Sequence, residues 1–218
     1  MENQKNTPAN KLSIWINYLQ GQNFRKTIHI IFYLIIPLAL LGSLIFIQNY
    51  RLNSQFGEWA WQVLLLVLFI KPIVKIIARK ELMWLLTYRR ELGILCFYLA
   101  FAHLSGSIFN LKIYELKNYL PPNNFLFTGA LASLLLIILY LTSNNFSMRF
   151  LKKNWKRVQY LSYLVLPLIS AHQILLQKEA EDTIGLIALN IAFIILKILE
   201  YKKITLKFKK YDQESQSS

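Results

Sequence analysis

The chain has 218 residues, of which 55% are hydrophobic and 17% charged, and its formal net charge is +14. Only 7 glycines and 6 prolines are present, which excludes a fibrous repeat and places the apolar residues in long regular elements. The positive charges fall between apolar stretches, which indicates membrane topology and anionic lipid as a partner rather than nucleic acid. The single cysteine, Cys96, excludes an intramolecular disulfide and a multi-cysteine metal site.

Residues 1–27 are polar and lack the apolar core of a signal peptide, so we expect a cytoplasmic N-terminal tail. Behind them, six apolar segments approach the roughly 20 residues that a helix needs to cross a bilayer. Their length and lack of alternation exclude membrane strands. The sequence predicts an all-α, polytopic membrane protein, with a six-helix transmembrane domain over 28–200 and a cytoplasmic tail over 201–218. The predicted spans are 28–47, 59–77, 92–109, 125–141, 160–176 and 184–199.

Lysines and arginines alternate between the loops in a way that sets the orientation of the chain. Both tails, the second loop and the fourth loop hold 18 of the 25, whereas the other three loops together hold 4. Both termini are therefore expected in the cytoplasm. Within the second loop, the apolar stretch 81–88 is too short to span and is predicted to lie as an interfacial helix. Lys71 and Lys75, near the cytoplasmic end of the second span, are expected to extend their amines to the interface.

The three histidines differ in their expected depth in the membrane. His29 lies at the cytoplasmic edge of the first span, where water and headgroups can satisfy it. The third and fifth spans run in the same direction, and His103 and His172 both lie roughly 16–18 Å above the cytoplasmic edge. Two histidines at one depth on parallel helices can supply both axial ligands of a haem. The alternative is an unrelated pair, each bonded to a helix carbonyl.

The surroundings of His103 are compatible with haem but do not decide between these alternatives. Ala100, Gly106 and Ser107 share its helix face and would leave room for a porphyrin, although small residues also serve helix packing. A zinc or di-iron site would need more ligands, and no Asp or Glu is expected at this depth.

Several short motifs resemble those of a known family. Residues 89–93 read Arg-Arg-Glu-Leu-Gly and lead through an aromatic-rich helix to His103. Together with further motifs, this resembles the ferric-reductase-like transmembrane superfamily, and within it the haem-binding membrane subunits of methionine sulfoxide reductase systems. The resemblance covers roughly 57–176. The further motifs are Gly-Glu-Trp-Ala at 57–60, opening the second span, Leu-Thr-Ser at 141–143, and the stretch from Trp to Tyr at 155–163.

The resemblance implies two histidines 13 residues apart on the fifth helix, but here Gln159 stands in place of the first. The corresponding inner position on the third helix is Arg89. Glutamine is a poor haem ligand beside imidazole, so one b-type haem is expected, held by His103 and His172. We expect Arg89 and Arg90 either to bind an anionic group, such as a haem propionate, a flavin phosphate or lipid, or only to anchor the topology.

By resemblance, the expected function is that of a bacterial inner-membrane cytochrome relaying electrons to an acceptor on the outer face. The implied donor is a quinol or reduced flavin, with a quinone or flavin reductase upstream, FMN or quinone as a further cofactor, and a periplasmic oxidoreductase as partner. The chain carries no NAD fingerprint, so it would act as a relay subunit. Two alternatives stay open. One is a ferric-chelate reductase acting by itself. The other is a haem-free scaffold or transporter, which stays open because Gln159 stands where the family has a histidine.

Overall fold

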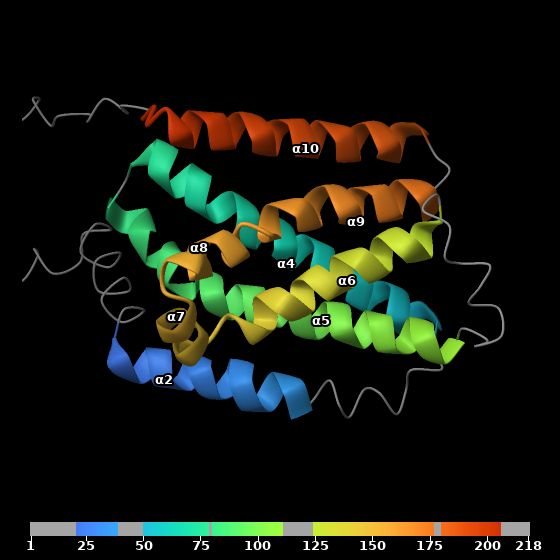
Figure 1. Cartoon of the computed structure of the whole chain (residues 1–218), viewed down its shortest axis with the longest axis horizontal. Coiled ribbons are helices and arrows are strands. Elements are labelled where there is room, and N and C mark those ends of the chain that lie inside the picture. The colour runs from blue at the N-terminus through green and yellow to red at the C-terminus, as the bar shows by residue number, and fades with distance from the viewer. Residues whose placement is uncertain (1–20, 39–49, 79, 111–123, 177–179, 206–218) are drawn as a thin grey trace, which may run out of the picture.

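A computed structural model of the chain describes residues 21–38, 50–78, 80–110, 124–176 and 180–205. Within these ranges every regular element is helical, which confirms the all-α prediction (Figure 1). The elements are α2 (Gln22–Ile30), η1 (Ile31–Ile35), α4 (Tyr50–Ile77), η3 (Lys80–Tyr88), α5 (Arg89–Asn110), α6 (Phe125–Leu141), α7 (Asn145–Leu151), α8 (Lys153–Gln159), α9 (Ser162–Leu176) and α10 (Ala180–Tyr201).

Four helical stretches in the described part of the chain are long and apolar enough to cross a membrane. They are Arg51–Ile77, Leu82–Ile108, Lys153–Leu176 and Glu181–Tyr201. A fifth span results if α6 and α7, which meet at 90°, count as one bent element. The apolar helix Lys26–Leu38 is shorter, and the rest of the predicted first span, 39–47, lies outside the described residues. Six spans and two cytoplasmic termini therefore stay predictions.

The long helices form two closely packed pairs, α4 with α5 and α6 with α9, and α10 lies against α4 and α9. Figure 1 shows α10 along one edge of the bundle and α2 along the opposite edge. The core between the pairs is mostly aliphatic, and it forms because apolar residues that recur at helical spacing turn their side chains inward. Its fully or nearly buried members include Leu64, Leu68, Cys96, Leu136, Val165, Leu166 and Phe193.

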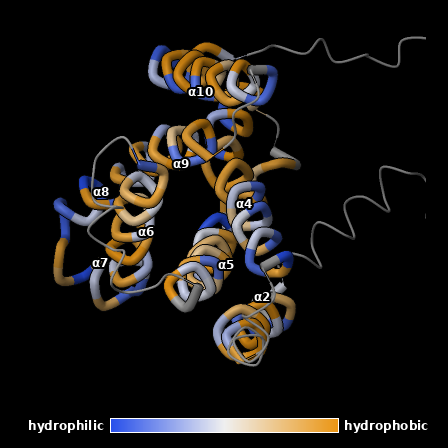
Figure 2. Tube along the Cα trace, turned by 90° about the vertical axis from the view of Figure 1, so that its right-hand side faces the viewer, coloured by the Kyte–Doolittle hydropathy of each residue, from blue (hydrophilic) through white to orange (hydrophobic). Residues whose placement is uncertain are grey.

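The outer surface of the bundle is also apolar, as expected for helices that face lipid rather than water. In Figure 2, where α10 is seen nearly end-on, much of its coil has the colour of hydrophobic residues. Large side chains on this helix are half exposed, and in water they would form an extended hydrophobic patch. They are Ile184, Ile187, Ile191, Ile194, Ile195 and Ile198.

Several helices extend beyond the predicted spans, and two differences matter most. Helix α4 begins at Tyr50 rather than at residue 59, so the motif at 57–60 lies within the helix and not at its start. The predicted fourth loop contains the short helices α7 and α8 instead of irregular chain. Both differences have one cause: hydropathy reports the part of a helix that crosses hydrocarbon, whereas polar residues continue or form helices beyond it.

Candidate functional site

The structure brings together the two histidines that were predicted to share one depth. The ring centroids of His103, from α5, and His172, from α9, are 6.5 Å apart, and the ring planes are inclined by 79°. Both line a cavity of about 430 Å³ whose walls come from α4, α5, α6 and α9. This volume lies within the range of ordinary ligand and cofactor sites.

Each imidazole is oriented by a backbone carbonyl of a neighbouring helix. Nδ1 of His103 lies 2.8 Å from the oxygen of Asn53 on α4, and Nδ1 of His172 lies 2.7 Å from the oxygen of Phe125 on α6. A carbonyl can only accept, so both Nδ1 atoms carry a proton. In a neutral imidazole the lone pair then resides on Nε2, which is the arrangement used by metal-binding histidines. The hydrogen bond to a helix carbonyl therefore leaves Nε2 of each ring available to bind a metal, so it does not exclude ligation.

Two glycines allow the rings to lie this close to helix backbone. Gly57 follows Asn53 by four residues, and Gly129 follows Phe125 by four. A Cβ on Gly57 would lie 3.1 Å from Nδ1 of the first histidine, and one on Gly129 would lie 2.8 Å from Nδ1 of the second. Both distances are shorter than ordinary van der Waals contact, which begins at 3.4 Å. The same arrangement thus occurs twice: a carbonyl, a glycine one turn later, and a histidine from the adjacent helix.

The geometry of the pair fits two axial ligands of one metal ion. A metal–imidazole bond of about 2.0–2.1 Å places the ring centroids of a linear pair roughly 6–6.5 Å apart, and the observed separation agrees. Glu58 also lines the cavity, which corrects the expectation that no carboxylate lies at this depth. Even so, no cluster of three metal-binding side chains occurs in the described part of the chain. This donor set suits a cofactor that supplies the remaining ligands itself, as haem does.

Small residues near His103 divide into two groups. Ala100 and Ser107 line the histidine cavity, as predicted. Gly106 does not: it faces α4, where a Cβ would collide with the amide of Asn53. The side chain of Asn53 also donates to Ser107 Oγ at 3.2 Å, so this residue holds α4 to α5 while its backbone orients the histidine.

The other predicted site residues lie in a second cavity of about 530 Å³, which is lined by Arg89, Arg90 and Gln159 among others. Arg89 and Gln159 therefore share one space, as expected for the inner pair. The amide of Gln159 donates to Thr142 Oγ1 at 3.1 Å. Leu136 lines both cavities, so a single layer of side chains separates them.

His29 lines neither the histidine cavity nor this second cavity, and its expected place at the membrane edge stays a prediction. Its side chain is half exposed, and Nε2 lies 3.8 Å from the Glu91 carboxylate, which is almost buried. Sequence reasoning did not anticipate this contact, because no spacing rule connects α2 with the first turn of α5.

The described part of the chain thus combines helices long and apolar enough to cross a membrane with two oriented histidines in one cavity, which defines a class of helical membrane protein. The chain belongs to the ferric-reductase-like transmembrane family, since the model described as "Ferric reductase like transmembrane component" matches residues 56–170, slightly over half of the chain. The match includes His103 and ends two residues before His172.

The chain is also similar to curated proteins of two kinds. The heme-binding subunit MsrQ of protein-methionine-sulfoxide reductase from Brucella anthropi is 33% identical over 126 residues, 56% of each chain. MsrQ of Brucella ovis is 31% identical over the same share. The magnetosome protein MamZ of Magnetospirillum gryphiswaldense is 30% identical over 127 residues, 56% of this chain and 19% of that protein. The match thus spans about half the length of the MsrQ relatives. No solved structure matches the chain. The resemblance predicted from the motifs is confirmed.

Proposed function

We propose that this chain is a membrane b-type cytochrome that holds one haem between His103 and His172. The observation that carries the proposal is the geometry of the pair: ring centroids 6.5 Å apart in one cavity, each Nδ1 bonded to a carbonyl. The MsrQ relatives are named as heme-binding subunits, which supports the same cofactor. When bound, haem supplies reversible one-electron chemistry at its iron.

The chain's own residues would orient and insulate this cofactor. The carbonyls of Asn53 and Phe125 keep the protons on Nδ1, so that both Nε2 atoms remain available as ligands. Apolar side chains such as Leu136 and Ile169 line the cavity and limit the entry of water. Low polarity around the site favours neutral imidazoles, and neutral imidazole is the form that binds iron.

We expect one haem rather than two because the second cavity offers no comparable ligand pair. Arg89 retains its proton in proteins and cannot ligate iron, and the amide of Gln159 is a weak ligand. Among the described residues that line this cavity there is no histidine. Arg89, Arg90 and Gln159 are therefore proposed to bind a group other than haem iron.

In the cell, the proposed role is a relay in a bacterial inner membrane, with six spans and both termini in the cytoplasm. Electrons would come from a quinol or a reduced flavin, with FMN or a quinone as further cofactor, and pass to an acceptor on the outer face. The proposed partner is a periplasmic oxidoreductase, because the MsrQ relatives are named as subunits of a methionine sulfoxide reductase.

The test is a reduced-minus-oxidised spectrum of protein purified from cells supplied with haem, with a pyridine haemochrome assay for stoichiometry. We expect one haem per chain. His103→Ala and His172→Ala should each lose it, while His29→Ala, the matched control, should keep it. A colourless wild-type protein would refute the proposal. Reduction of a ferric chelate by the purified chain and a donor alone would instead support a self-sufficient ferric reductase.

A further inference from the structure

Helix α7 exposes a pair of stacked aromatic side chains. The rings of Phe146 and Phe150, which are one helical turn apart, have centroids separated by 6.1 Å and planes inclined by 9°. These residues are 77% and 75% exposed, and among the large hydrophobic residues that the structure describes only Tyr201 is more exposed. Apolar side chains that gather on a surface mark contact with a protein or a membrane.

The opposite side of α7 faces the bundle. Asn145 accepts a hydrogen bond from Arg90 Nη1 at 3.0 Å, and Met148 lines the second cavity. At 3.6 residues per turn, Met148 lies about 160° around the helix from both Phe146 and Phe150. The aromatic face therefore points away from the bundle, and Figure 2 shows α7 at an outer edge of it.

Hydrogen bonds hold α7 at a right angle to α6. The two helices meet at 90°, and Figure 1 shows α7 turned out of the line of α6. Asn144 Nδ2 and Ser147 Oγ both donate to the Leu141 carbonyl, at 2.8 and 3.0 Å. Asn144 Oδ1 also accepts from the backbone N–H of Ser147 at 2.7 Å, which caps the start of α7. Side chains thus satisfy the backbone groups on both sides of the bend, so the two helices do not continue as one straight helix.

The length of α6 places α7 near a membrane boundary. Helix α6 has 17 residues and is therefore about 25 Å long, close to the roughly 30 Å of a hydrocarbon core. Because α6 is predicted to cross the bilayer, its end at Leu141 should lie near the boundary between acyl chains and headgroups. A helix at 90° to α6 then lies in the plane of that boundary.

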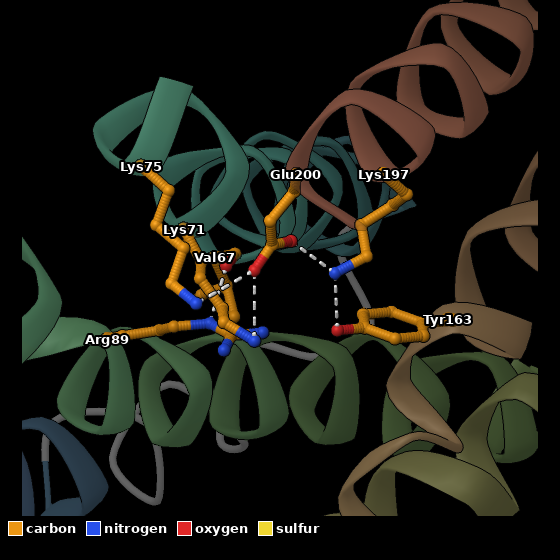
Figure 3. Close-up of polar contacts among 7 residues, drawn as sticks. All are labelled: Val67, Lys71, Lys75, Arg89, Tyr163, Lys197 and Glu200. Atoms are coloured by element: carbon orange, nitrogen blue, oxygen red, sulfur yellow. Dashed lines mark hydrogen bonds and ion pairs between the residues drawn. The ribbon is translucent and has the colours of Figure 1, made fainter. Parts of the chain in front are cut away.

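The chain around α7 is strongly cationic. Residues 145–159 include five lysines and arginines and no acidic residue. Arg149, Lys152 and Lys153 are exposed, and no carboxylate in the described part of the chain forms an ion pair with them. By contrast, the lysines between α4 and α10 share the carboxylate of Glu200 (Figure 3). A second copy of the chain would bring the same cations to this face, whereas acidic lipid headgroups would neutralise them.

We propose that α7 is an in-plane membrane helix that binds an acidic leaflet. Phe146 and Phe150 insert at the boundary between headgroups and acyl chains, and Arg149, Lys152 and Lys153 contact the anionic headgroups. An aromatic face beside cationic side chains is the pattern of helices that lie in a membrane interface. Helices α6 and α7 are then a span followed by a surface helix, rather than one bent span. Insertion of α7 requires α6 to cross the bilayer, but it does not require haem at the histidine pair.

Spin labels on single cysteines measure the depth of α7. The full chain is labelled in Phe146→Cys, Phe150→Cys and the control Asn154→Cys, an exposed polar position on α8, and is placed in nanodiscs of phosphatidylcholine and phosphatidylglycerol. Cys96 is buried and should not react, which labelling of the wild type checks. Collisions with oxygen report hydrocarbon, and collisions with a neutral nickel chelate report water. We expect labels at 146 and 150 to collide more with oxygen, and less with nickel, than the label at 154.

Two outcomes of this experiment would overturn the proposal. Labels at 146 and 150 that collide with nickel as often as the label at 154 would place the aromatic face in water. Labels protected from both reagents would show that a second copy or another protein covers the face. All three substitutions replace exposed side chains, so the bundle should keep its fold, which thermal unfolding checks.

A fluorescent label at Phe146→Cys tests the charge of the leaflet. The nanodiscs contain equal amounts of the two lipids, and brominated acyl chains, which quench the label, are placed on one lipid at a time. We expect stronger quenching by brominated phosphatidylglycerol, and joint Arg149→Gln and Lys152→Gln should lose most of this excess. Joint Lys202→Gln and Lys203→Gln, which remove two charges beyond the end of α10, are the matched control and should keep it. Equal quenching by the two lipids in the otherwise unchanged chain would overturn the contact with acidic headgroups.

Haem content of the same samples separates the membrane contact of α7 from the proposed function. Insertion of α7 in a chain without haem would refute only the cytochrome assignment. One haem per chain with both labels in water would refute only the proposal for α7.

Discussion

Among the glycines that the structure describes, Gly129 is the one whose replacement by alanine should disturb His172 most. The added Cβ would lie 2.8 Å from Nδ1 and 2.9 Å from Cε1 of the ring, whereas ordinary contact begins at 3.4 Å. The ring must therefore retreat by about 0.6 Å, which disturbs the hydrogen bond between its Nδ1 and the Phe125 carbonyl. Such overpacking costs about 1–3 kcal/mol in a well-packed interior.

The consequence for cofactor binding follows from the loss of orientation. Disruption of the hydrogen bond that positions a metal-binding histidine costs about 10–100-fold in affinity. We expect Gly129→Ala to weaken haem binding by about that factor. Gly57→Ala should have a smaller effect, about tenfold or less, because its Cβ would lie 3.1 Å from the ring of His103 and the shortfall is only 0.3 Å.

The assay is titration of the haem-free protein in nanodiscs with haem, followed by electron paramagnetic resonance of the ferric state, whose g values report the orientation of axial imidazoles. Gly93→Ala and Gly185→Ala are matched controls, since a Cβ at either position meets nothing within 4 Å. Wild-type affinity and g values in Gly129→Ala, or equal losses in the controls, would refute the reasoning.

Three further substitutions test contacts around the bundle. Glu200→Gln leaves three partly exposed lysines without their carboxylate, and thermal unfolding should show a loss of about 1–2 kcal/mol, with Lys202→Gln as the neutral comparison. Asn124→Ala removes the side chain that accepts from Leu126 N at 2.9 Å, and should cost about 1 kcal/mol in the same measurement. Trp155→Phe loses the 2.8 Å bond from Nε1 to the Thr142 carbonyl, and denaturant unfolding should register about 0.5–1.5 kcal/mol. An unchanged midpoint in any of these variants would contradict the corresponding contact.

Hydropathy was enough to predict the long apolar parts of α4, α5, α6, α9 and α10, because a helix that crosses hydrocarbon needs a long apolar run. It could not predict the start of α4, since residues 50–58 are mostly polar and give no such signal. That polar segment nevertheless matters for the site, because it contains Asn53, whose carbonyl orients His103. The helix that hydropathy predicted was thus too short to include Asn53, the residue that orients His103.

The depth argument brought His103 and His172 together correctly, since helix rise is regular and both spans begin at the same side. Haem ligation by the pair stays a prediction. Gly129 was missed, because its role depends on which helix lies beside α9. Lys71 and Lys75 were expected to reach the interface, which stays a prediction, but their contact with Glu200 was missed. The packing of α10 on α4 creates that contact, and no local sequence pattern predicts it.

The repeated carbonyl, glycine and histidine arrangement also bears on how the protein assembles. His103 is oriented entirely within the α4–α5 pair, and His172 entirely within the α6–α9 pair. Each half can therefore present an aligned imidazole before the two halves meet. A ligand that bridges the histidines binds only the docked form, so it stabilises docking by mass action. Supply of the cofactor would then control how much of the newly inserted chain reaches its final packing.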